Sequence, residues 1–532
     1  MVPYQQKEKK KGNFRWNYAP LIIFLVMPCF FPLETIASTT TEAEALLKWK
    51  SSLSVFEGFS FPLDSWSLSN LRNMCNWTGI VCNGDGAIVS EINLPNAYLS
   101  GTLHHLSFTS FPSLTRFNIT GNYFNGSIPP AIGDLSNLVF LDLSYNEFDG
   151  KIPPQIGNLR RELQYLDLNG NDLSGIIPHQ IGNLQKVWFL DIGHNNLLLD
   201  ASHWSSKVKS FPMLRHFSFA EGTLISFTDF ILYSRNLTYL DLSLTCLNGS
   251  IPESLFTNLK KLECLDLSFN DFSGPLSPNI NNLSNLNDLR LSENQFQGEI
   301  PYSIGQLKDL QVLDISYNLL NSTIPPSLSS LTKLSYLDLS SNFISGNISP
   351  HLISNWTELT FLGLANNSFS SNIPSEIGSL TNLSEINLPN ADLSGALDQL
   401  NFTSFPNVTR FNISGNNFRG SIPAAIAHLS NLLFLDLSNN SFNGNIPPEI
   451  GNLTVLQYLD LSRNDVSGVV PHQIGNLHKV WFLDLGSNLL LEASGLSKVK
   501  SFPVLRHLSL SGIKFMSRFP DFILRLSEPN LS

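Results

Sequence analysis

From Val89 onward, apolar residues recur in one fixed pattern that returns every 24 or 25 residues. In one copy the apolar positions are Leu138, Leu141, Leu143 and Phe148, and the ninth position is Asn146. Alternation of apolar and polar residues over positions 3 to 6 is typical of a short strand with one buried face. Eighteen units follow this pattern, beginning at residues 89, 114, 138, 163, 187, 214, 237, 262, 286, 310, 334, 359, 383, 408, 432, 456, 480 and 505.

A unit this short cannot bury its leucines alone, so neighbouring units must stack into one continuous core. The pattern therefore predicts an α/β solenoid, a right-handed leucine-rich-repeat superhelix over residues 89–532 with parallel strands on its concave face. Asparagine fills position 9 in 13 of the 18 units, where a tight inward turn must bond its backbone groups internally. Because a solenoid grows along one axis, the length of the chain does not indicate the number of its domains.

Residues 1–38 have the order of a secretory signal peptide: a basic stretch, an apolar segment from Leu21 to Leu33, and the small residues Ala37 and Ser38. A membrane anchor is the alternative. Thirteen helical residues span only about 20 Å, however, against a hydrocarbon core of about 30 Å. We therefore expect a cleaved signal followed by a separate segment, residues 39–88, before the repeats.

Residues 39–88 carry the features of a lid for the open end of the solenoid. Thr41 and Glu44 have the spacing of a capping box that opens a helix, and Leu46 and Trp49 lie on one face of it. Cys75 and Cys82 then bracket a short loop. The secretory route permits a disulfide between them.

The repeats end in Gly-x-Ile-Pro, as at residues 150–153, and in this they resemble the plant extracellular subtype of leucine-rich repeats. The segment before them looks like the amino-terminal cap of plant receptor-like kinases and receptor-like proteins. This resemblance implies an extracellular module that binds a secreted peptide or a cell-wall-derived ligand on the concave face and a co-receptor kinase at the rim. The closing cap, membrane helix and kinase of full-length relatives do not follow here. The resemblance therefore implies a membrane link only through a carboxy-terminal anchor that this chain lacks.

A longer period lies over the short one. Residues 90–96, SEINLPN, return at 384–390, and KVWFLD at 186–191 returns at 479–484. A block of six units, residues 90–236, is thus duplicated at 384–528. Units 187 and 214 lack the Gly-x-Ile-Pro tail and gather aromatic residues, which we expect to pack in the core: Trp188, Trp204, Phe211, Phe217, Phe219, Phe227 and Phe230.

The charge of the chain and its sequence motifs give no sign of enzymatic activity or of nucleic-acid binding. A net charge of −11 disfavours nucleic acid as a partner. The Gly-rich loop and the His-Arg-Asp and Asp-Phe-Gly motifs of kinases are absent, as are nucleophile elbows and zinc-protease motifs, so we expect no enzyme, no cofactor and no metal. Aspartate is the common residue at position 5 of this repeat, so we do not interpret these aspartates as a catalytic pair. Cys246 and Cys264 do not stack, and we expect them to be unpaired.

Asparagine-linked glycosylation sequons map the free surface. They lie at Asn76, Asn118, Asn125, Asn236, Asn248, Asn282, Asn321, Asn347, Asn355, Asn366, Asn382, Asn401, Asn407, Asn412, Asn439, Asn452 and Asn530. Four of them, Asn118, Asn366, Asn412 and Asn439, fall on the expected concave face or its edge. The nine units from 138 to 334 carry none there, which leaves that window free for a ligand.

Within this window, the unit that starts at residue 286 differs most from the residues common to the other units. Arg290 is the only basic residue at position 5 of any unit. Aromatic rings beside charged groups are what a peptide groove uses for anchoring and register. We therefore predict a binding groove lined by Tyr239, Asp241, Asp266, Phe269, Asp288, Arg290, Glu293, Asp314, Tyr317, Tyr336 and Asp338. An ordinary solvated sheet face is the plainer alternative for any one of them.

Two other functions stay open at this point. Polygalacturonase-inhibiting proteins have similar repeats but are shorter, near ten units, and carry a closing cap. A truncated, non-functional receptor product is the third interpretation. The length of the array favours the receptor module.

Overall fold

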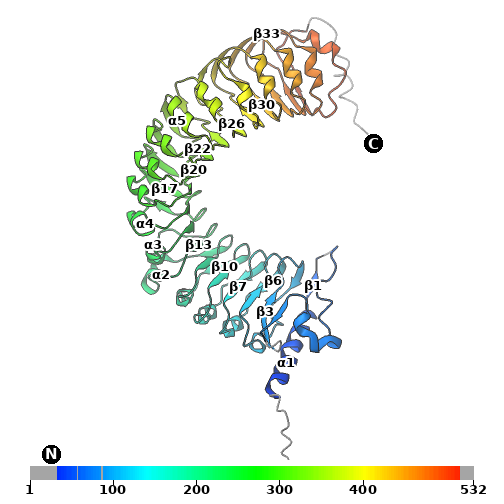
Figure 1. Ribbon diagram of the computed structural model, residues 1–532, viewed down its shortest axis with the longest axis vertical. Helices are drawn as coiled ribbons and strands as arrows, with labels where there is room; N and C mark the ends of the chain where they lie inside the picture. Colours follow the sequence, from blue (N-terminus) through cyan, green and yellow to red (C-terminus); the bar gives the residue numbers. More distant parts are fainter. Residues whose placement is uncertain (1–32, 57, 85–87, 516–532) are drawn as a thin grey trace, which may run out of the picture.

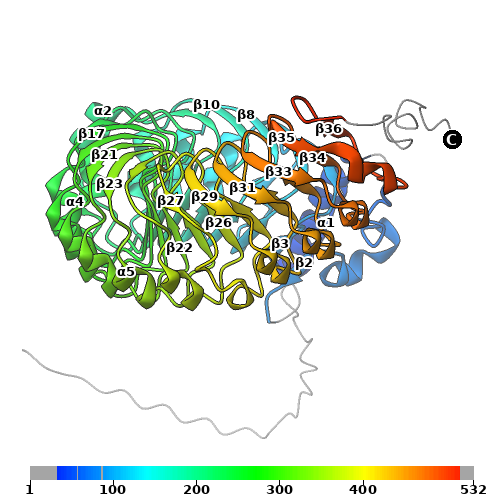
Figure 2. The same ribbon diagram turned by 90° about the horizontal axis from the view of Figure 1, so that it is seen from above.

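The computed structural model describes residues 33–56, 58–84 and 88–515. The described chain coils into an open arc, with the cap at one end and the last strands at the other (Figures 1 and 2). The predicted signal segment therefore lies mostly outside the described residues. No helix in the described part is long and apolar enough to cross a membrane.

One strand from each unit lines the inside of the arc (Figure 1). The eighteen strands are parallel and pair in sequence order, with residues at the same repeat position opposite one another, as in Tyr239↔Cys264↔Asp288. They are β3 (Val89–Asn93), β5 (Arg116–Asn118), β7 (Phe140–Asp142), β9 (Tyr165–Asp167), β11 (Phe189–Asp191), β13 (His216–Ser218), β14 (Tyr239–Asp241), β16 (Cys264–Asp266), β18 (Asp288–Arg290), β20 (Val312–Asp314), β22 (Tyr336–Asp338), β24 (Phe361–Gly363), β26 (Glu385–Asn387), β28 (Arg410–Asn412), β30 (Phe434–Asp436), β32 (Tyr458–Asp460), β34 (Phe482–Asp484) and β36 (His507–Ser509). The predicted units and their concave strands are thus confirmed.

The leucines at positions 1, 4 and 6 form one core that runs through the whole arc, and Leu138, Leu141 and Leu143 are fully buried. The position-9 asparagines link the coils. Asn294 Nδ2 donates to the carbonyls of Leu267, Leu291 and Ser292, and its Oδ1 accepts the N–H of Phe272. Each such asparagine therefore satisfies backbone groups of its own coil and of the preceding one.

A second set of strands lies behind the first, where the repeat tail begins. It forms three short sheets: β1 (Ser54–Val55), β4 (Leu99–Gly101), β6 (Tyr123–Ser127), β8 (Glu147–Gly150), β10 (Asp172–Ile176) and β12 (Asn196–Leu198); β15 (Asn248–Gly249), β17 (Asp271–Gly274), β19 (Gln295–Gly298), β21 (Leu319–Ser322), β23 (Phe343–Gly346) and β25 (Ser368–Phe369); and β27 (Ser394–Gly395), β29 (Asn417–Ser421), β31 (Ser441–Asn445), β33 (Asp465–Val469) and β35 (Leu490–Glu492). Gly150 has a φ of 72°, a left-handed conformation that glycine adopts at no steric cost.

Short helices cover the convex side of the arc (Figure 1). Most follow the proline of the repeat tail, since proline is well suited to the first turn of a helix. They are η2 (Phe108–Ser110), η3 (Pro130–Asp134), η4 (Pro154–Asn158), η5 (His179–Asn183), η6 (Pro278–Asn282), η7 (Tyr302–Gln306), η8 (Pro326–Ser330), η9 (Ser375–Ser379), η10 (Phe402–Ser404), η11 (Ala424–His428), η12 (Pro448–Asn452), η13 (His472–Asn476) and η14 (Ala493–Lys498), with α2 (Ala201–Lys207), α3 (Asp229–Tyr233), α4 (Glu253–Asn258) and α5 (Pro350–Asn355).

The cap consists of α1 (Leu33–Lys50), η1 (Leu68–Asn76) and β2 (Ile80–Cys82), which pairs antiparallel with β3. Trp49, Trp66 and Trp77 are buried in it. The predicted disulfide between Cys75 and Cys82 is present. The predicted helix start is wrong, because α1 begins at Leu33 and places Thr41 inside the helix rather than at its N-cap.

The second set of strands is interrupted between β12 and β15, where the repeats lose their Gly-x-Ile-Pro tail. Helices α2 and α3 occupy this region, and Asp200 caps α2 by accepting the N–H groups of Ser202 and His203. The expected core packing is confirmed for Trp204, Phe211, Phe217, Phe219 and Phe230, which are buried, while Phe227 is half-buried. It is wrong for Trp188, which is 40% exposed.

Candidate ligand-binding surface

The structure brings the predicted groove residues onto one face of five neighbouring strands. Position 3 holds Tyr239, Cys264, Asp288, Val312 and Tyr336 in register. Position 5 holds Asp241, Asp266, Arg290, Asp314 and Asp338, also in register. The predicted juxtaposition is therefore present for positions 3 and 5, while Phe269, Glu293 and Tyr317 lie at position 8, beyond the ends of the strands.

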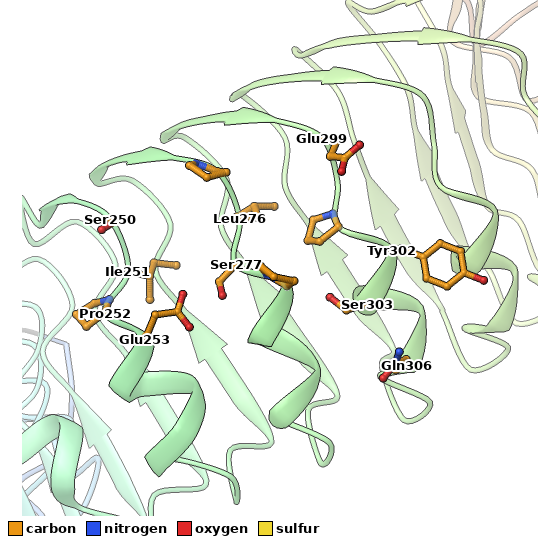
Figure 3. A pocket seen from close by; sticks show the side chains of 13 residues that line it. Ser250, Ile251, Pro252, Glu253, Leu276, Ser277, Glu299, Tyr302, Ser303 and Gln306 are labelled. Atoms are coloured by element: carbon orange, nitrogen blue, oxygen red, sulfur yellow. The ribbon is translucent and has the colours of Figure 1, made fainter.

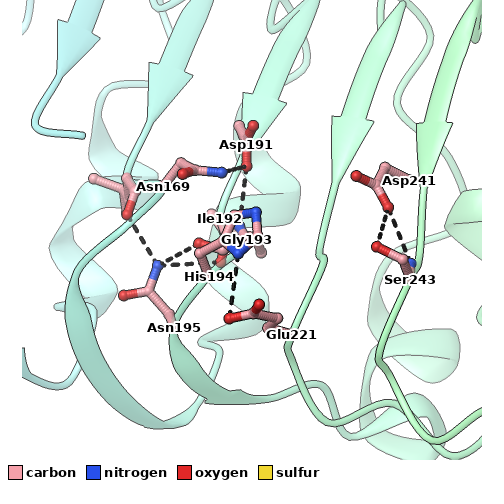
Figure 4. Close-up of polar contacts among 10 residues, drawn as sticks. Asn169, Asp191, Ile192, Gly193, His194, Asn195, Glu221, Asp241 and Ser243 are labelled. Atoms are coloured by element: carbon pink, nitrogen blue, oxygen red, sulfur yellow. Dashed lines mark hydrogen bonds and ion pairs between the residues drawn. The ribbon is translucent and has the colours of Figure 1, made fainter. Parts of the chain in front are cut away.

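The position-5 aspartates are not free carboxylates. In Asp266, Oδ1 accepts the backbone N–H of Ser268 at 2.9 Å and its hydroxyl at 2.6 Å. Asp191 and Asp241 make the same bond to the backbone N–H two residues on (Figure 4), as do Asp314 and Asp338. This Asx turn ends each strand, so one oxygen of each aspartate has a structural role and only the other is available to a ligand.

Arg290 is likewise engaged within its own strand. Its Nε donates to Asp288 Oδ1 at 3.0 Å, and its second guanidinium nitrogen donates to Asp288 Oδ2 at 3.2 Å. Asp266 and Asp314 flank it at position 5 of the adjacent strands. Although burial opposes the charged form, these carboxylates raise the pKa of Arg290 above its ordinary value. The Arg290 side chain is 43% exposed, and the bonds to Asp288 use only two of its five N–H donors.

Burial is the main cause of the pKa shifts of two carboxyl groups and one thiol on this surface. It raises the pKa of Asp266 and of Asp338 above the ordinary carboxyl value, although bonds to the following serines oppose the shift. It raises the pKa of the Cys264 thiol to about 12, with help from neighbouring carboxylates. Cys246 and Cys264 are both free thiols, as expected.

Position 8 turns the chain away from the strand in a left-handed conformation. Glycine and asparagine adopt this conformation easily, but Tyr145, Leu244, Phe269 and Tyr317 also adopt it, with φ values between 49° and 55°. Their side chains are 45–65% exposed. Position 8 has a positive φ in every unit from Asn96 to Gly512, so the conformation belongs to the repeat and is not by itself a sign of function. Phe269 and Tyr317 belong to the predicted groove.

A second feature of the concave face was not predicted. At position 3 the side chains of successive units stack face to face at 4.1–4.2 Å: Phe140, Tyr165, Phe189, His216 and Tyr239. Arg116 covers one end of this stack at 3.8 Å from the Phe140 ring and pairs with Glu91. The duplicated block repeats the stack with Arg410, Phe434, Tyr458, Phe482 and His507. The recurring aromatic-x-Asp pattern was a visible signal for it.

The four concave sequons differ in accessibility. Asn366 and Asn439 lie at position 8 and are exposed. Asn118 and Asn412 lie at position 5, where Oδ1 accepts the N–H of Thr120 and of Ser414 in the same Asx turn. Asn412 is only 9% exposed.

A large hollow lies away from the concave strands, at the tails of three consecutive units (Figure 3). It has a volume of about 870 Å³, and its lining includes Pro252, Pro278, Pro301 and the exposed Tyr302. Glu253 accepts a hydrogen bond from Asn279 at 2.8 Å, and such bonds lower the pKa of this carboxyl. No three His, Cys, Asp or Glu side chains in the described ranges are placed to share a metal ion.

Comparison with known proteins agrees with this architecture. Residues 40–83 match the leucine-rich-repeat N-terminal domain, residues 262–401 match a leucine-rich repeat region, and six further repeats match between residues 113 and 477. MDIS1-interacting receptor like kinase 2 of Arabidopsis thaliana is 38% identical over 119 residues, which are 22% of this chain and 11% of that protein. The matched segments thus span about a tenth of the first curated relatives.

Solved structures match over most of the chain. The Arabidopsis receptor kinase HAESA, in complex with the peptide hormone IDA and the co-receptor SERK1, has a TM-score of 0.68 at 28% identity and covers 92% of both chains. A TDR receptor has a TM-score of 0.63 at 29% identity, covering 81% of this chain and 69% of that one. The chain thus belongs to the leucine-rich-repeat family, and its cap and coils are similar to those of plant receptor-kinase ectodomains.

Proposed function

We propose that this chain is the extracellular recognition module of a plant receptor and that it binds an extended peptide along β14, β16, β18, β20 and β22. The observation that carries the proposal is Arg290, the one cation among the aspartates at position 5 of these five strands, whose side chain is 43% exposed. A peptide carboxylate or carbonyl meets Arg290, and basic or hydroxyl groups meet the outer oxygens of Asp241, Asp266 and Asp314.

The rest of the surface suits such a ligand. Tyr239 and Tyr336 are half-buried at the two sides of the window, and Phe269 and Tyr317 are exposed at its edge. Aromatic anchors of this kind supply most of the binding energy in many interfaces. The complexes of HAESA with IDA and SERK1, and of the plant peptide hormone receptor RGFR1 with RGF2, support a peptide ligand and a co-receptor kinase as partners at the extracellular face of the plasma membrane or in the apoplast.

The test is selection of peptides from a displayed library of linear random sequences on the secreted chain, followed by calorimetric titration. We expect Arg290→Ala and Asp288→Ala to weaken a selected peptide about ten- to hundredfold, because charge-assisted bonds in a partly desolvated groove are lost. Asp266→Asn removes charge but keeps the Asx turn, so it reports on recognition alone. Tyr302→Ala, in the hollow away from the concave strands, is the matched control. Selected peptides that bind all these variants as tightly as the parent would place the groove elsewhere.

A further inference from the structure

The duplicated block has left two versions of one cluster at the edge of the concave sheet. In the second copy, Lys479, Trp481, Val504 and Arg506 line a hollow of about 340 Å³, within the roughly 300–1,000 Å³ range of ligand pockets. The equivalent residues of the first copy are Lys186, Trp188, Met213 and Arg215.

The ladder of stacked rings fixes the position of Trp481. Its ring meets those of Tyr458 and Phe482 edge-on at 5.9 Å, and these two rings stack on each other at 4.2 Å. Arg506 lies at the same position of the next strand, where its N–H donates to the Trp481 carbonyl. Trp481 is nevertheless 41% exposed, and Val504 is 48% exposed. An apolar floor is therefore held rigidly and left uncovered by the described residues.

The two copies differ in charge and in space. In the first copy, Lys186 Nζ is paired with Glu162 Oε2 at 3.0 Å. The second copy has Val455 at the position of Glu162, and within the described ranges Lys479 and Arg506 form no ion pair. Val504 is also shorter than Met213. The second copy thus presents two uncompensated cations around an open apolar hollow.

We propose that this hollow binds an acidic peptide segment in which an Asp or Glu stands next to a large apolar residue. The apolar side chain covers Trp481 and Val504, while the carboxylate lies between Lys479 and Arg506. Charge complementarity selects the acidic group, since neither cation of the hollow has an ion-pair partner among the residues that the structure describes. The site is separate from the central groove, so a negative result here would leave the proposed function untouched.

The probe is the blocked dipeptide N-acetyl-Asp-Phe-amide. Its binding to the secreted chain is measured by saturation-transfer NMR. We expect Trp481→Ala and Arg506→Gln each to weaken its binding about tenfold or more. Trp188→Ala and Arg215→Gln, the matched changes in the first copy, should leave it unchanged. The isosteric N-acetyl-Asn-Phe-amide, which lacks only the charge, should bind about tenfold more weakly. Since Trp481 and Arg506 are exposed, none of these changes removes core packing.

A gain of binding tests the same idea in reverse. Glu162→Val combined with Met213→Val gives the first copy the charge and space of the second, and we expect a second equivalent of the dipeptide to bind. No detectable binding, binding that survives Trp481→Ala, or equal binding of the Asn isostere would each overturn the proposal.

Discussion

Glu42 Oε2 accepts a hydrogen bond at 3.1 Å from the backbone N–H of Val89, the residue that opens the first repeat strand. Glu42 is fully buried, and its Oε1 has no hydrogen-bond partner. Burial raises the pKa of this carboxyl from 4.5 to about 7, although the bond from Val89 opposes the shift. The contact between cap and solenoid is therefore sensitive to pH.

The folded-state pKa of Glu42 lies above the unfolded value, so the folded protein binds the proton more tightly. The stabilisation is complete below about pH 4.5 and is lost as the pH rises to about 7, a change of about 3 kcal/mol at most. We expect Glu42→Gln to flatten the fall in melting temperature across this range. Glu44→Gln, at an exposed position of the same helix, is the control. A variant with the parent's pH profile would contradict this role.

The Asx turns predict that the position-5 aspartates contribute to stability through Oδ1 and not through charge. Asp266→Ala should lower the free energy of unfolding by about 1–2 kcal/mol, because the N–H of Ser268 loses its acceptor. Asp266→Asn should be nearly neutral, since Asn118 and Asn412 make the same turn. Chemical denaturation of the two variants distinguishes them, and equal losses would show that charge matters instead.

The asparagine ladder predicts a larger loss at position 9. Asn294→Ala leaves the N–H of Phe272 without its acceptor in a buried turn, and it removes one of the hydrogen bonds to each of three carbonyls that keep a second donor. We expect it to cost about 2–3 kcal/mol. Gln297→Ala, at an exposed site in the same unit, should change the free energy of unfolding little. A loss no larger than that of Gln297→Ala would refute the role of the ladder.

The cap disulfide closes a short loop between Cys75 and Cys82. Cys82→Ser should destabilise the cap by about 2–3 kcal/mol and lower the secreted yield, because the unfolded cap gains chain entropy. In the native parent, an alkylating reagent should label the exposed Cys246 and leave Cys75 and Cys82 untouched. Labelling of all three would show that the pair is reduced.

The strand ladder continues without a break across the start of the second block, from β24 through β26 to β28. We therefore expect a single rigid arc in solution, with no hinge near residue 383. Small-angle scattering should fit one arc. A curve that requires two independently moving lobes would contradict this.

The repeat period predicts the fold well because burial of each leucine depends only on its position in the coil. The same period says which side chains face the concave side, so Tyr239, Asp266 and Arg290 were brought together correctly. It does not say what those groups contact. The bond of Arg290 to Asp288 along its own strand depends on rotamers. The start of α1 at Leu33 was missed because residues 35–40 are mostly threonine, serine and isoleucine, which have low helix propensity, whereas Thr41 and Glu44 have the spacing of a capping box.

The equivalence of β3 and β26 has a consequence for the history of the gene. Both strands contain Glu-Ile-Asn at positions 3 to 5, and each pairs with a strand that opens with arginine, Arg116 or Arg410. Residues 90–96 and 384–390 are identical, so misaligned recombination there removes or adds twelve whole coils in frame. Every internal strand in the product still has two neighbours of the correct register. The reach of the arc can therefore change in one genetic event, without an intermediate that must refold around a damaged core.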